Sequence, residues 1–257
     1  MSNPFNLGGK VAIITGAGAG LGADFAAALA AHGATVVVAD RKPAADTVER
    51  VRRDVAGARI ADRPTDVSDE AQVKALVDGV VLTFGGVDIV VNNAAIFSGL
   101  VTTPVTEIGV DLWDQIMAVN VRGPFLLAKH AAPHMIAKRR GKIINIASGV
   151  AYKGMAGMVH YATSKGAVVT MTRSLARELG AYDINVNALA PGLIMSETIS
   201  ANEGHIQDFR APVLASRSIK RDGFPRDLLG ALIFLASEAS DFITGQTIAV
   251  DGGSVNL

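Results

Sequence analysis

Tyr161 and Lys165 form a pair of residues whose types and spacing could do chemistry. They lie four residues apart in the stretch HYATSKGAVV, which has the apolar spacing of a helix, so both side chains leave the same helical face. A free tyrosine has a pKa of about 10, and a neighbouring ammonium group favours the phenolate. The pair raises the hypothesis of a tyrosine that exchanges a proton with a substrate oxygen near neutral pH, although this spacing alone is not specific.

A glycine-rich turn near the start of the chain predicts a phosphate site. The segment VAIITGAGAGLG passes from an apolar run into closely spaced glycines and then into a helical pattern. Glycines let the backbone approach a pyrophosphate, and a helix N-terminus supplies unpaired N–H groups. The next apolar run ends on Asp40, about twenty residues further on, where a carboxylate can bond ribose hydroxyls. Together these features indicate a dinucleotide.

Short β-branched runs alternate with longer amphipathic stretches along the whole chain. The runs KVAIIT, TVVVAD, DIVVNN, KIINIAS, INVNALAP and TIAVDGG predict strands that are buried on both faces. Helices are expected at Leu21–His32, Ala44–Val55, Asp69–Phe84, Asp111–Lys138, His160–Gly180 and Pro225–Ser237. This alternation predicts an α/β fold, with a doubly wound parallel sheet and helices on both faces.

One domain over residues 1–257 is expected, because no internal repeat or break in composition divides the chain. Ligands bind at the carboxyl ends of the strands in such sheets, so the chemistry should follow the apolar runs. The least regular part is residues 193–224, which we expect to be a substrate-binding loop.

The composition excludes several classes of function. Lys and Arg together number 24, as do Asp and Glu, and no long basic run occurs, so no nucleic-acid partner is expected. The chain has no cysteine and its histidines have no H-x-x-x-H spacing, so no metal is expected. No charged and apolar leader and no run of about 18 apolar residues is present. We therefore expect a soluble cytoplasmic protein without a membrane partner.

The glycine turn resembles a motif of the short-chain dehydrogenase/reductase family. Residues 15–22 fit TGxxxGxG, and further family motifs follow in order: DVSD at Asp66, NNAA with Ala95 in the usual glycine place, APG at residues 190–192, and the ending ITGQTIAVDGG. The resemblance implies a single-domain Rossmann fold with about seven parallel strands. It also implies an oxidoreductase that acts on CH–OH groups with a nicotinamide cofactor.

The resemblance also implies the residues that contact the cofactor. They are Gly16, Gly18, Gly20, Leu21, Gly22, Asp40, Arg41, Asp66, Val67, Asn93, Ala94, Ala95, Tyr161, Lys165, Pro191, Gly192, Ile194 and Ser196. Asp66 and Val67 match the adenine contact of the family. Ser196 stands where the family usually has a threonine that binds the carboxamide.

A catalytic tetrad follows from the same resemblance. Ser148 ends the run KIINIAS, thirteen residues before Tyr161, and Asn120 in AVNVRGPF matches the fourth member. Tyr161 would take the alcohol proton as hydride leaves the carbinol carbon, while Ser148 bonds the same oxygen. Lys165 would favour the phenolate and hold the nicotinamide ribose, and Asn120 would order a water for proton relay.

The choice between NAD and NADP depends on two neighbouring residues. Asp40 would repel a 2'-phosphate, whereas Arg41 could bind one. Position 19 is alanine, where many relatives that use NADP carry a basic residue, so Arg41 lacks a second cation. NAD is therefore the predicted cofactor, with NADP as the weaker alternative.

The substrate is less closely defined by the sequence. We expect a pocket wall of Phe97, Val150, Tyr152, Met155, Met158 and the loop from Leu193, with no arginine poised for an anion. This predicts a hydrophobic secondary alcohol, cyclic or aromatic, and its ketone. Two alternatives stay open: a 3-oxoacyl-carrier-protein reductase and a nucleotide-sensing protein without catalysis. The family resemblance also predicts a homotetramer.

Overall fold

The backbone is described for residues 3–200 and 203–255 of a computed structural model, and the side chains for residues 3–199 and 210–255. Seven strands form one parallel sheet in the order β3-β2-β1-β4-β5-β6-β7. They are β1 (Val11–Thr15), β2 (Thr35–Ala39), β3 (Arg59–Asp62), β4 (Ile89–Asn92), β5 (Gly141–Ile146), β6 (Ile184–Pro191) and β7 (Thr247–Val250). The α/β doubly wound Rossmann architecture expected from the sequence is therefore present.

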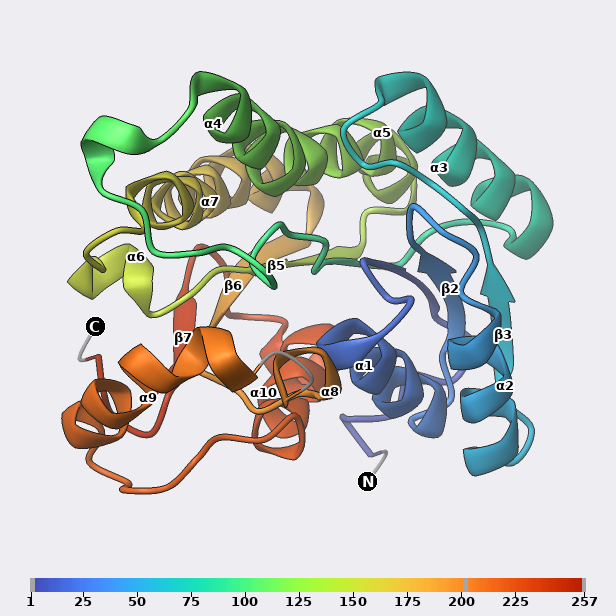
Figure 1. Ribbon diagram of the computed structural model, residues 1–257. Helices are drawn as coiled ribbons and strands as arrows, with labels where there is room; N and C mark the ends of the chain where they lie inside the picture. The colour runs from blue at the N-terminus through green and yellow to red at the C-terminus, as the bar shows by residue number, and fades with distance from the viewer. Residues whose placement is uncertain (1–2, 201–202, 256–257) are drawn as a thin grey trace.

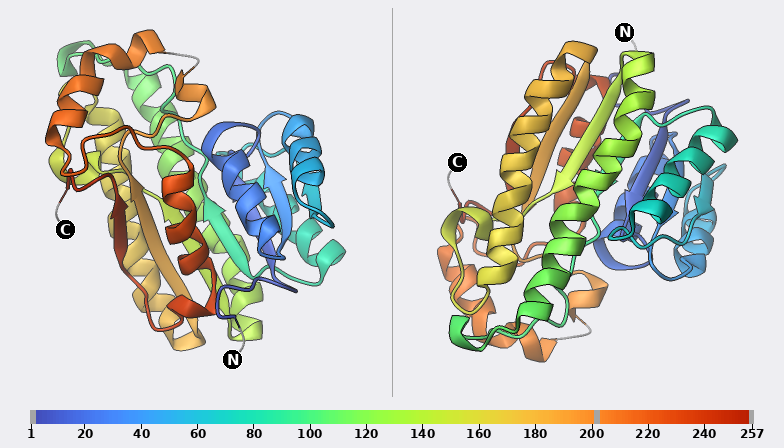
Figure 2. Two further views of the ribbon diagram at one scale, coloured as in Figure 1. Left: turned by 90° about the horizontal axis from the view of Figure 1, so that it is seen from below. Right: turned by 90° about the horizontal axis from the view of Figure 1, so that it is seen from above.

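Helices cover both faces of the sheet (Figures 1 and 2). They are α1 (Gly20–Ala31), α2 (Ala45–Asp54), α3 (Glu70–Phe84), α4 (Val110–Met117), α5 (Gly123–Lys138), α6 (Val150–Lys153), α7 (Val159–Leu179), α8 (Glu197–Ser200), α9 (Glu203–Ser216) and α10 (Arg226–Ala236). Helices α1, α2 and α10 lie on one face, and α3, α5 and α7 lie on the other. Short 3-10 turns occur at Val105–Glu107, Gly180–Tyr182 and Glu238–Ser240.

The alternation of side chains along β1 explains why both faces must be covered. Ala12 and Ile14 pack into the core beneath α1 and α10, whereas Val11 and Ile13 pack into the core beneath α3 and α5. Successive residues of a strand point to opposite faces, so a strand that is apolar throughout needs helices on both sides.

The strand order reverses between β1 and β4, which are neighbours in the sheet. The chain leaves β1 toward β2 and β3, and leaves β4 toward β5, β6 and β7. The loops that follow β1 and β4 therefore diverge and open a crevice at the carboxyl edge of the sheet, where α/β proteins bind ligands.

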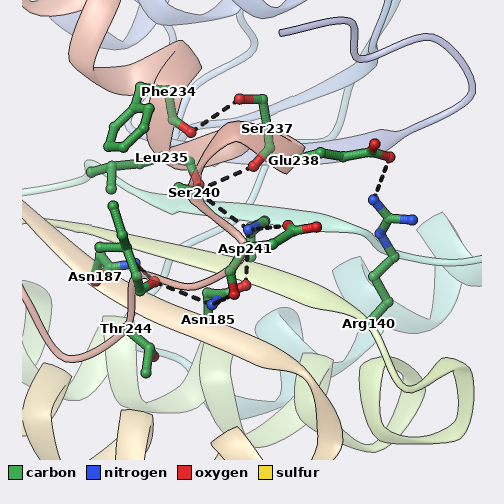
Figure 3. Close-up of polar contacts among 12 residues, drawn as sticks. Arg140, Asn185, Asn187, Phe234, Leu235, Ser237, Glu238, Ser240, Asp241 and Thr244 are labelled. Atoms are coloured by element: carbon green, nitrogen blue, oxygen red, sulfur yellow. Dashed lines mark hydrogen bonds and ion pairs between the residues drawn. The ribbon is translucent and has the colours of Figure 1, made fainter. Parts of the chain in front are cut away.

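A buried polar network fastens the opposite edge of the sheet. The Lys142 side chain on β5 is 6% exposed, and Nζ donates to Asn185 Oδ1 at 2.8 Å and Asp241 Oδ1 at 2.7 Å. Asn185 Nδ2 in turn donates to the carbonyl oxygens of Asp241 and Ile243. Figure 3 shows Asn185 and Asp241 in this network. These bonds join the starts of β5 and β6 to the turn before β7, away from the ligand edge.

Two expectations about the elements were wrong, and one strand was missing from the predicted runs. This strand is β3, since Arg59–Asp62 is short and only Ile60 is buried, although the family resemblance implied about seven strands. The helix expected over Asp111–Lys138 is interrupted by a π-helical turn at Ala118–Arg122. The stretch 193–224 is not irregular throughout, because it contains α8 and α9.

Candidate active site

A cavity of about 550 Å³ opens at the carboxyl ends of β1, β4, β5 and β6. Most of the residues that the sequence predicted for the site line it: Gly16, Gly20, Leu21, Gly22, Asp40, Asn93, Ala94, Ala95, Ser148, Tyr161, Lys165, Pro191, Gly192, Ile194 and Ser196. One cavity therefore holds both the glycine-rich turn and the tyrosine. A dinucleotide and a substrate could bind in it next to each other.

The glycine-rich turn lies close against the segment that follows β4. Gly16 has φ of 63°, and a Cβ at this position would lie 2.6 Å from Ala94 Cα, so only glycine fits. Asn93 Nδ2 donates to the carbonyl oxygens of Thr15 at 3.0 Å and Gly16 at 2.9 Å, which fixes the turn. The glycine-rich turn therefore presents its backbone to the cavity, with no glycine side chain between the backbone and a ligand.

The start of α1 is open to an anion. Its N-cap residue, Ala19, provides no side-chain hydrogen bond, and the first turn carries no acidic residue. The N–H groups of the first turn of a helix have no partner within the helix, and the dipole there is positive. This end of α1 lies in the cavity wall at Gly20 and Leu21. The site thus fits the pyrophosphate of a nicotinamide dinucleotide, which would occupy this turn.

Asp40 lies at the end of β2 and also lines the cavity. Its Oδ2 accepts a hydrogen bond from Gly18 N at 3.0 Å, which holds the carboxylate beside the glycine turn. Arg41 follows it but is exposed and outside the cavity lining. At this end of the cavity a ligand therefore meets a carboxylate rather than a guanidinium group.

Ser148 and Tyr161 meet at the other end of the cavity. Ser148 follows β5 and Tyr161 lies in the first turn of α7, and both residues line the cavity. Lys165 lies one turn further along α7, with Nζ 5.7 Å from the centroid of the Tyr161 ring. Its Nζ donates to the Ile146 carbonyl oxygen at 2.7 Å. The structure thus brings these three predicted residues together.

Burial opposes the expected phenolate in the cofactor-free site. Burial raises the pKa of Tyr161 to about 12, although its hydrogen bond with Ser148 acts in the opposite direction. Burial also lowers the pKa of Lys165 to about 8. Lys165 by itself does not offset the burial of the phenol, because both groups lose their hydration; the expected phenolate depends on Lys165 together with the oxidised nicotinamide ring and stays a prediction. Further positive charge or a hydrogen-bonded ligand is needed to ionise the phenol.

Asn120 connects the loop after β4 to α7. It lies in the π-helical turn and is 1% exposed. Its Oδ1 accepts from Ile96 N at 2.7 Å, and its Nδ2 donates to Ser164 Oγ at 3.1 Å. Ser164 Oγ in turn donates to the Tyr161 carbonyl oxygen at 2.7 Å. Asn120 is therefore linked to the tyrosine through Ser164, which the sequence analysis did not single out although it is three residues from Tyr161.

Four predicted cofactor contacts lie outside the cavity lining: Gly18, Arg41, Asp66 and Val67. Asp66 Oδ1 accepts from Ser68 N and Ser68 Oγ. The Val67 side chain is buried next to Gly123, where a Cβ would lie 2.9 Å from Val67 Cγ2. These two residues shape the loop after β3 through their contacts with the protein.

The predicted substrate wall needs two corrections. Phe97, Val150 and Met155 line the cavity, as does Leu193. Tyr152 does not, because it points to a separate surface groove with Arg173. Met158 is buried at 2% exposure and is absent from the lining.

Several polar residues in the lining were not predicted: Lys153, Ser216, Arg217, Asp251 and Ser254. Arg217 is an arginine in the lining, but it is 3% exposed and donates to the carbonyl oxygens of Leu193 at 2.6 Å and Arg221 at 2.7 Å, so it does not contradict the expectation that no arginine is poised for an anion. No sequence motif points to these residues, since the chain brings them to the cavity from three distant segments.

Comparison with known proteins decides the family. A family profile described as Enoyl-(Acyl carrier protein) reductase matches residues 16–255. The chain belongs to the short-chain dehydrogenase/reductase family. It is 40% identical to 2-dehydro-3-deoxy-D-gluconate 5-dehydrogenase of Dickeya dadantii, a match that covers 98% of this chain and 97% of the relative. Members that are named dehydrogenases support an oxidoreductase acting on CH–OH groups, so this chain is such an enzyme.

Two further members illustrate the range of the family. Galactitol 2-dehydrogenase of Agrobacterium fabrum is 39% identical, over 96% of this chain and 98% of the relative. The solved structure of a gluconate 5-dehydrogenase from Burkholderia cenocepacia in complex with NADP and tartrate has a TM-score of 0.89 and 38% identity. That match covers 98% of this chain and 97% of the other.

The described residues contain neither a candidate metal cluster nor a candidate membrane span. No group of three or more His, Cys, Asp or Glu residues there is arranged to hold a metal ion. No helix within the same residues is long and apolar enough to cross a bilayer.

Proposed function

We propose that the protein transfers hydride between NAD and a secondary alcohol or its ketone, with Tyr161 as the general acid and base. The observation that carries the proposal is that Ser148, Tyr161 and Lys165 line the same cavity as the glycine-rich turn. When bound, the nicotinamide ring supplies the hydride acceptor or donor. The protein's own groups bind the reactants and move the proton.

Tyr161 has the protonation state that ketone reduction requires. Because burial raises its pKa to about 12, the phenol holds its proton at neutral pH and can donate it to a carbonyl oxygen. Alcohol oxidation needs the reverse transfer, which positive charge near the phenol favours. Lys165 supplies one such charge below its pKa of about 8. Ser148 orients the same oxygen.

Lys165 and Asn120 have supporting roles in the proposal. Lys165 Nζ uses one of its donors for the Ile146 carbonyl oxygen, so others can bond the ribose of the cofactor. The Asn120 amide holds Ile96 and Ser164, and through Ser164 it positions the turn that carries Tyr161. The ordered water that the family resemblance implies at Asn120 stays a proposal.

The position of Asp40 supports NAD rather than NADP. Its carboxylate is held by Gly18 N in the cavity wall, where it can accept hydrogen bonds from ribose hydroxyls. A 2'-phosphate would lie next to the Asp40 carboxylate and bring two negative groups together. The cationic residues that follow Asp40 in the sequence are Arg41 and Lys42. The gluconate 5-dehydrogenase structure holds NADP, so the preference needs a direct test.

The substrate proposal rests on the cavity wall. Phe97, Val150, Met155, Leu193 and Val213 give the wall beside Tyr161 an apolar character. Phe97 packs on the Tyr161 ring with centroids 4.8 Å apart. We therefore infer a substrate with an apolar body, cyclic or aromatic, around the carbinol carbon.

Two alternatives make different demands on the chain. A 3-oxoacyl-carrier-protein reductase would reduce a carrier-linked ketone and ordinarily prefer NADPH. A nucleotide-sensing protein would bind cofactor without turnover, and the presence of Ser148, Tyr161 and Lys165 in one cavity speaks against it. Absorbance of reduced cofactor during incubation with simple alcohols separates both from the proposed activity.

The replacement Tyr161→Phe tests the proposal most directly. It removes only the phenolic oxygen, so NADH should still bind while turnover falls by about a hundredfold or more. Steady-state rates and NADH fluorescence titration measure the two effects separately. Turnover within a few-fold of wild type would contradict the assignment of Tyr161.

A homotetramer is proposed on the basis of exposed apolar side chains on α4, α5 and α7. Val110 is 72% exposed, Phe125 48% and Val159 39%. Apolar surface of this kind on helices supports subunit contacts with two-fold symmetry.

A further inference from the structure

Three polar side chains from distant segments meet at the substrate end of the cavity. Lys153 ends α6, Ser216 ends α9, and Ser254 lies in the segment after β7. Lys153 Nζ donates to Ser254 Oγ at 2.7 Å, and the hydroxyl oxygens of Ser216 and Ser254 are 2.6 Å apart. All three residues line the same cavity as Ser148 and Tyr161. In Figure 1, α6, α9 and the end of the chain lie on one side of the molecule.

The Lys153 charge is not balanced by a neighbouring carboxylate. Among the residues whose side chains are described, none places a carboxylate oxygen within ion-pair distance of Lys153 Nζ. The hydrogen bond to Ser254 uses only one of the three N–H donors of Lys153. The other charged residues at this end are Arg217, 3% exposed, and Asp251, 5% exposed. Among the described lining residues at this end, the cations Lys153 and Arg217 therefore outnumber the single carboxylate of Asp251 by one.

Asp251 uses one carboxylate oxygen within its own segment, while Oδ2 is buried without a hydrogen-bond partner among the described residues, 3.5 Å from where a Cβ on Gly149 would lie. Its Oδ1 accepts hydrogen bonds from the backbone N–H groups of Gly253 and Ser254, at 3.0 Å and 3.1 Å. The side chain is buried under the same segment that presents Ser254. The Asp251 carboxylate thus fixes the position of Ser254, and the Ser254 hydroxyl accepts the hydrogen bond from Lys153.

Lys153 and Ser148 lie close together along the chain and line the same cavity. Helix α6 begins two residues after Ser148, and its span from Val150 to Lys153 is about 4.5 Å at 1.5 Å per residue. The last segment packs beside Ser148, since a Cβ on Gly149 would lie 3.4 Å from Val255 Cγ2. Because Ser148 and Lys153 line one cavity, we expect a ligand that contacts both to be a small molecule.

We propose that Lys153, Ser216 and Ser254 form a subsite for a carboxylate, so that the substrate is a hydroxy acid or its oxo acid. This inference rests on the proposed alcohol–ketone activity and names its substrate class. The ammonium group and two serine hydroxyls, which rotate to donate, match the acceptor oxygens of one carboxylate. A single net positive charge suits a monoanion better than a phosphate dianion. The apolar wall then contacts the carbon skeleton between the carboxylate and the carbinol.

The test compares secondary alcohols that carry a carboxylate with their own primary amides, in straight-chain and cyclic series. Wild-type kcat/KM should be about tenfold or more higher for an acid than for its amide, mainly through KM. Lys153→Met keeps the stem without the charge, and should lower kcat/KM about tenfold for the acid but less than threefold for the amide. Lys153→Arg should keep the preference for the acid. Lys74→Met, on the exposed surface of α3, is the matched control.

Equal turnover of acid and amide by the wild type would overturn the subsite, as would an equal loss for both in Lys153→Met. An equal loss of kcat/KM for acid and amide would mean that Lys153 only anchors the segment after β7 through its hydrogen bond to Ser254. Ser216→Ala and Ser254→Ala should each reduce the acid preference by a smaller factor than Lys153→Met.

A binding measurement separates this inference from the proposed activity. Cyclohexanecarboxylate and cyclohexanecarboxamide are added to the NADH-bound protein, and the shift in Tm is recorded for each. The acid should raise Tm more than the amide in wild type, and this difference should vanish in Lys153→Met. No difference in wild type would refute the subsite. If the wild type oxidises no alcohol but keeps the acid-specific shift, the proposed activity fails and the subsite stands.

Discussion

Replacing Lys165 by methionine should stabilise the cofactor-free protein, although the same lysine is proposed to bind the cofactor. The side chain is 3% exposed, and burial lowers its pKa from 10.5 to about 8 without a compensating charge. Nζ bonds only the Ile146 carbonyl oxygen among the described residues. The protein therefore holds an ammonium group in an environment that disfavours its charge.

The size of the effect follows from the pKa. Each pKa unit corresponds to about 1.4 kcal/mol, so burial of the ammonium costs about 3 kcal/mol at pH 7. Methionine keeps an apolar stem of similar length, and its loss of the hydrogen bond to Ile146 costs about 1 kcal/mol. The free energy of unfolding of Lys165→Met should exceed that of wild type by about 2 kcal/mol at pH 7.

The difference should shrink at alkaline pH. The folded-state pKa of Lys165 is lower than the unfolded value of 10.5, so between about 8 and 10.5 the unfolded chain binds a proton that the folded protein has lost. Wild-type stability therefore rises with pH across this window, and the cost of burial falls from about 3 kcal/mol at pH 7 to about 1 kcal/mol at pH 9.5. The variant has no such titration, so the two proteins should approach equal stability.

Urea denaturation of both proteins without cofactor, at pH 7, 8.5 and 9.5, measures this. Comparing them at each pH cancels the titration of all other groups. Lys165→Arg is the control, because its guanidinium stays charged throughout and should be less stable than wild type at every pH. The reasoning is refuted if Lys165→Met is less stable at pH 7, or if its advantage does not change up to pH 9.5. Saturating NADH should stabilise wild type more than the methionine variant.

Three further predictions concern other parts of the molecule. Wild type should prefer NAD to NADP by about tenfold or more in kcat/KM, and Asp40→Ala should lose or reverse this preference. Steady-state kinetics that give an unchanged ratio in the variant would show that Asp40 does not bind the ribose. Lys142→Met should lower the free energy of unfolding by about 1–3 kcal/mol, because Asn185 Oδ1 and Asp241 lose a buried partner; a stabilised variant in urea denaturation would disprove this. Light scattering at micromolar concentration should give the mass of a tetramer, and a monomer would contradict the proposed contacts.

Local sequence determined the elements that carry the site. Apolar β-branched runs such as those of β1 and β5 have no stable alternative to a sheet covered on both faces, and their ends marked Gly16 and Ser148. The spacing of Tyr161 and Lys165 is a local property of a helix, so it could be recognised without the fold. Signals that depend on few residues failed, as with the short strand β3 and the π-helical turn at Asn120.

Tertiary structure decided which groups share an environment. Lys153 and Ser254 are 101 positions apart, and only the packing of the chain end against α6 brings them within hydrogen-bonding distance. The direction of the Tyr161 pKa likewise depends on how much water the surrounding elements exclude, and the lysine four residues away could not reveal this. Sequence spacing sets which side chains can be neighbours along one element. Desolvation and contacts between elements arise only when the whole chain has packed, and they set the charge of the site.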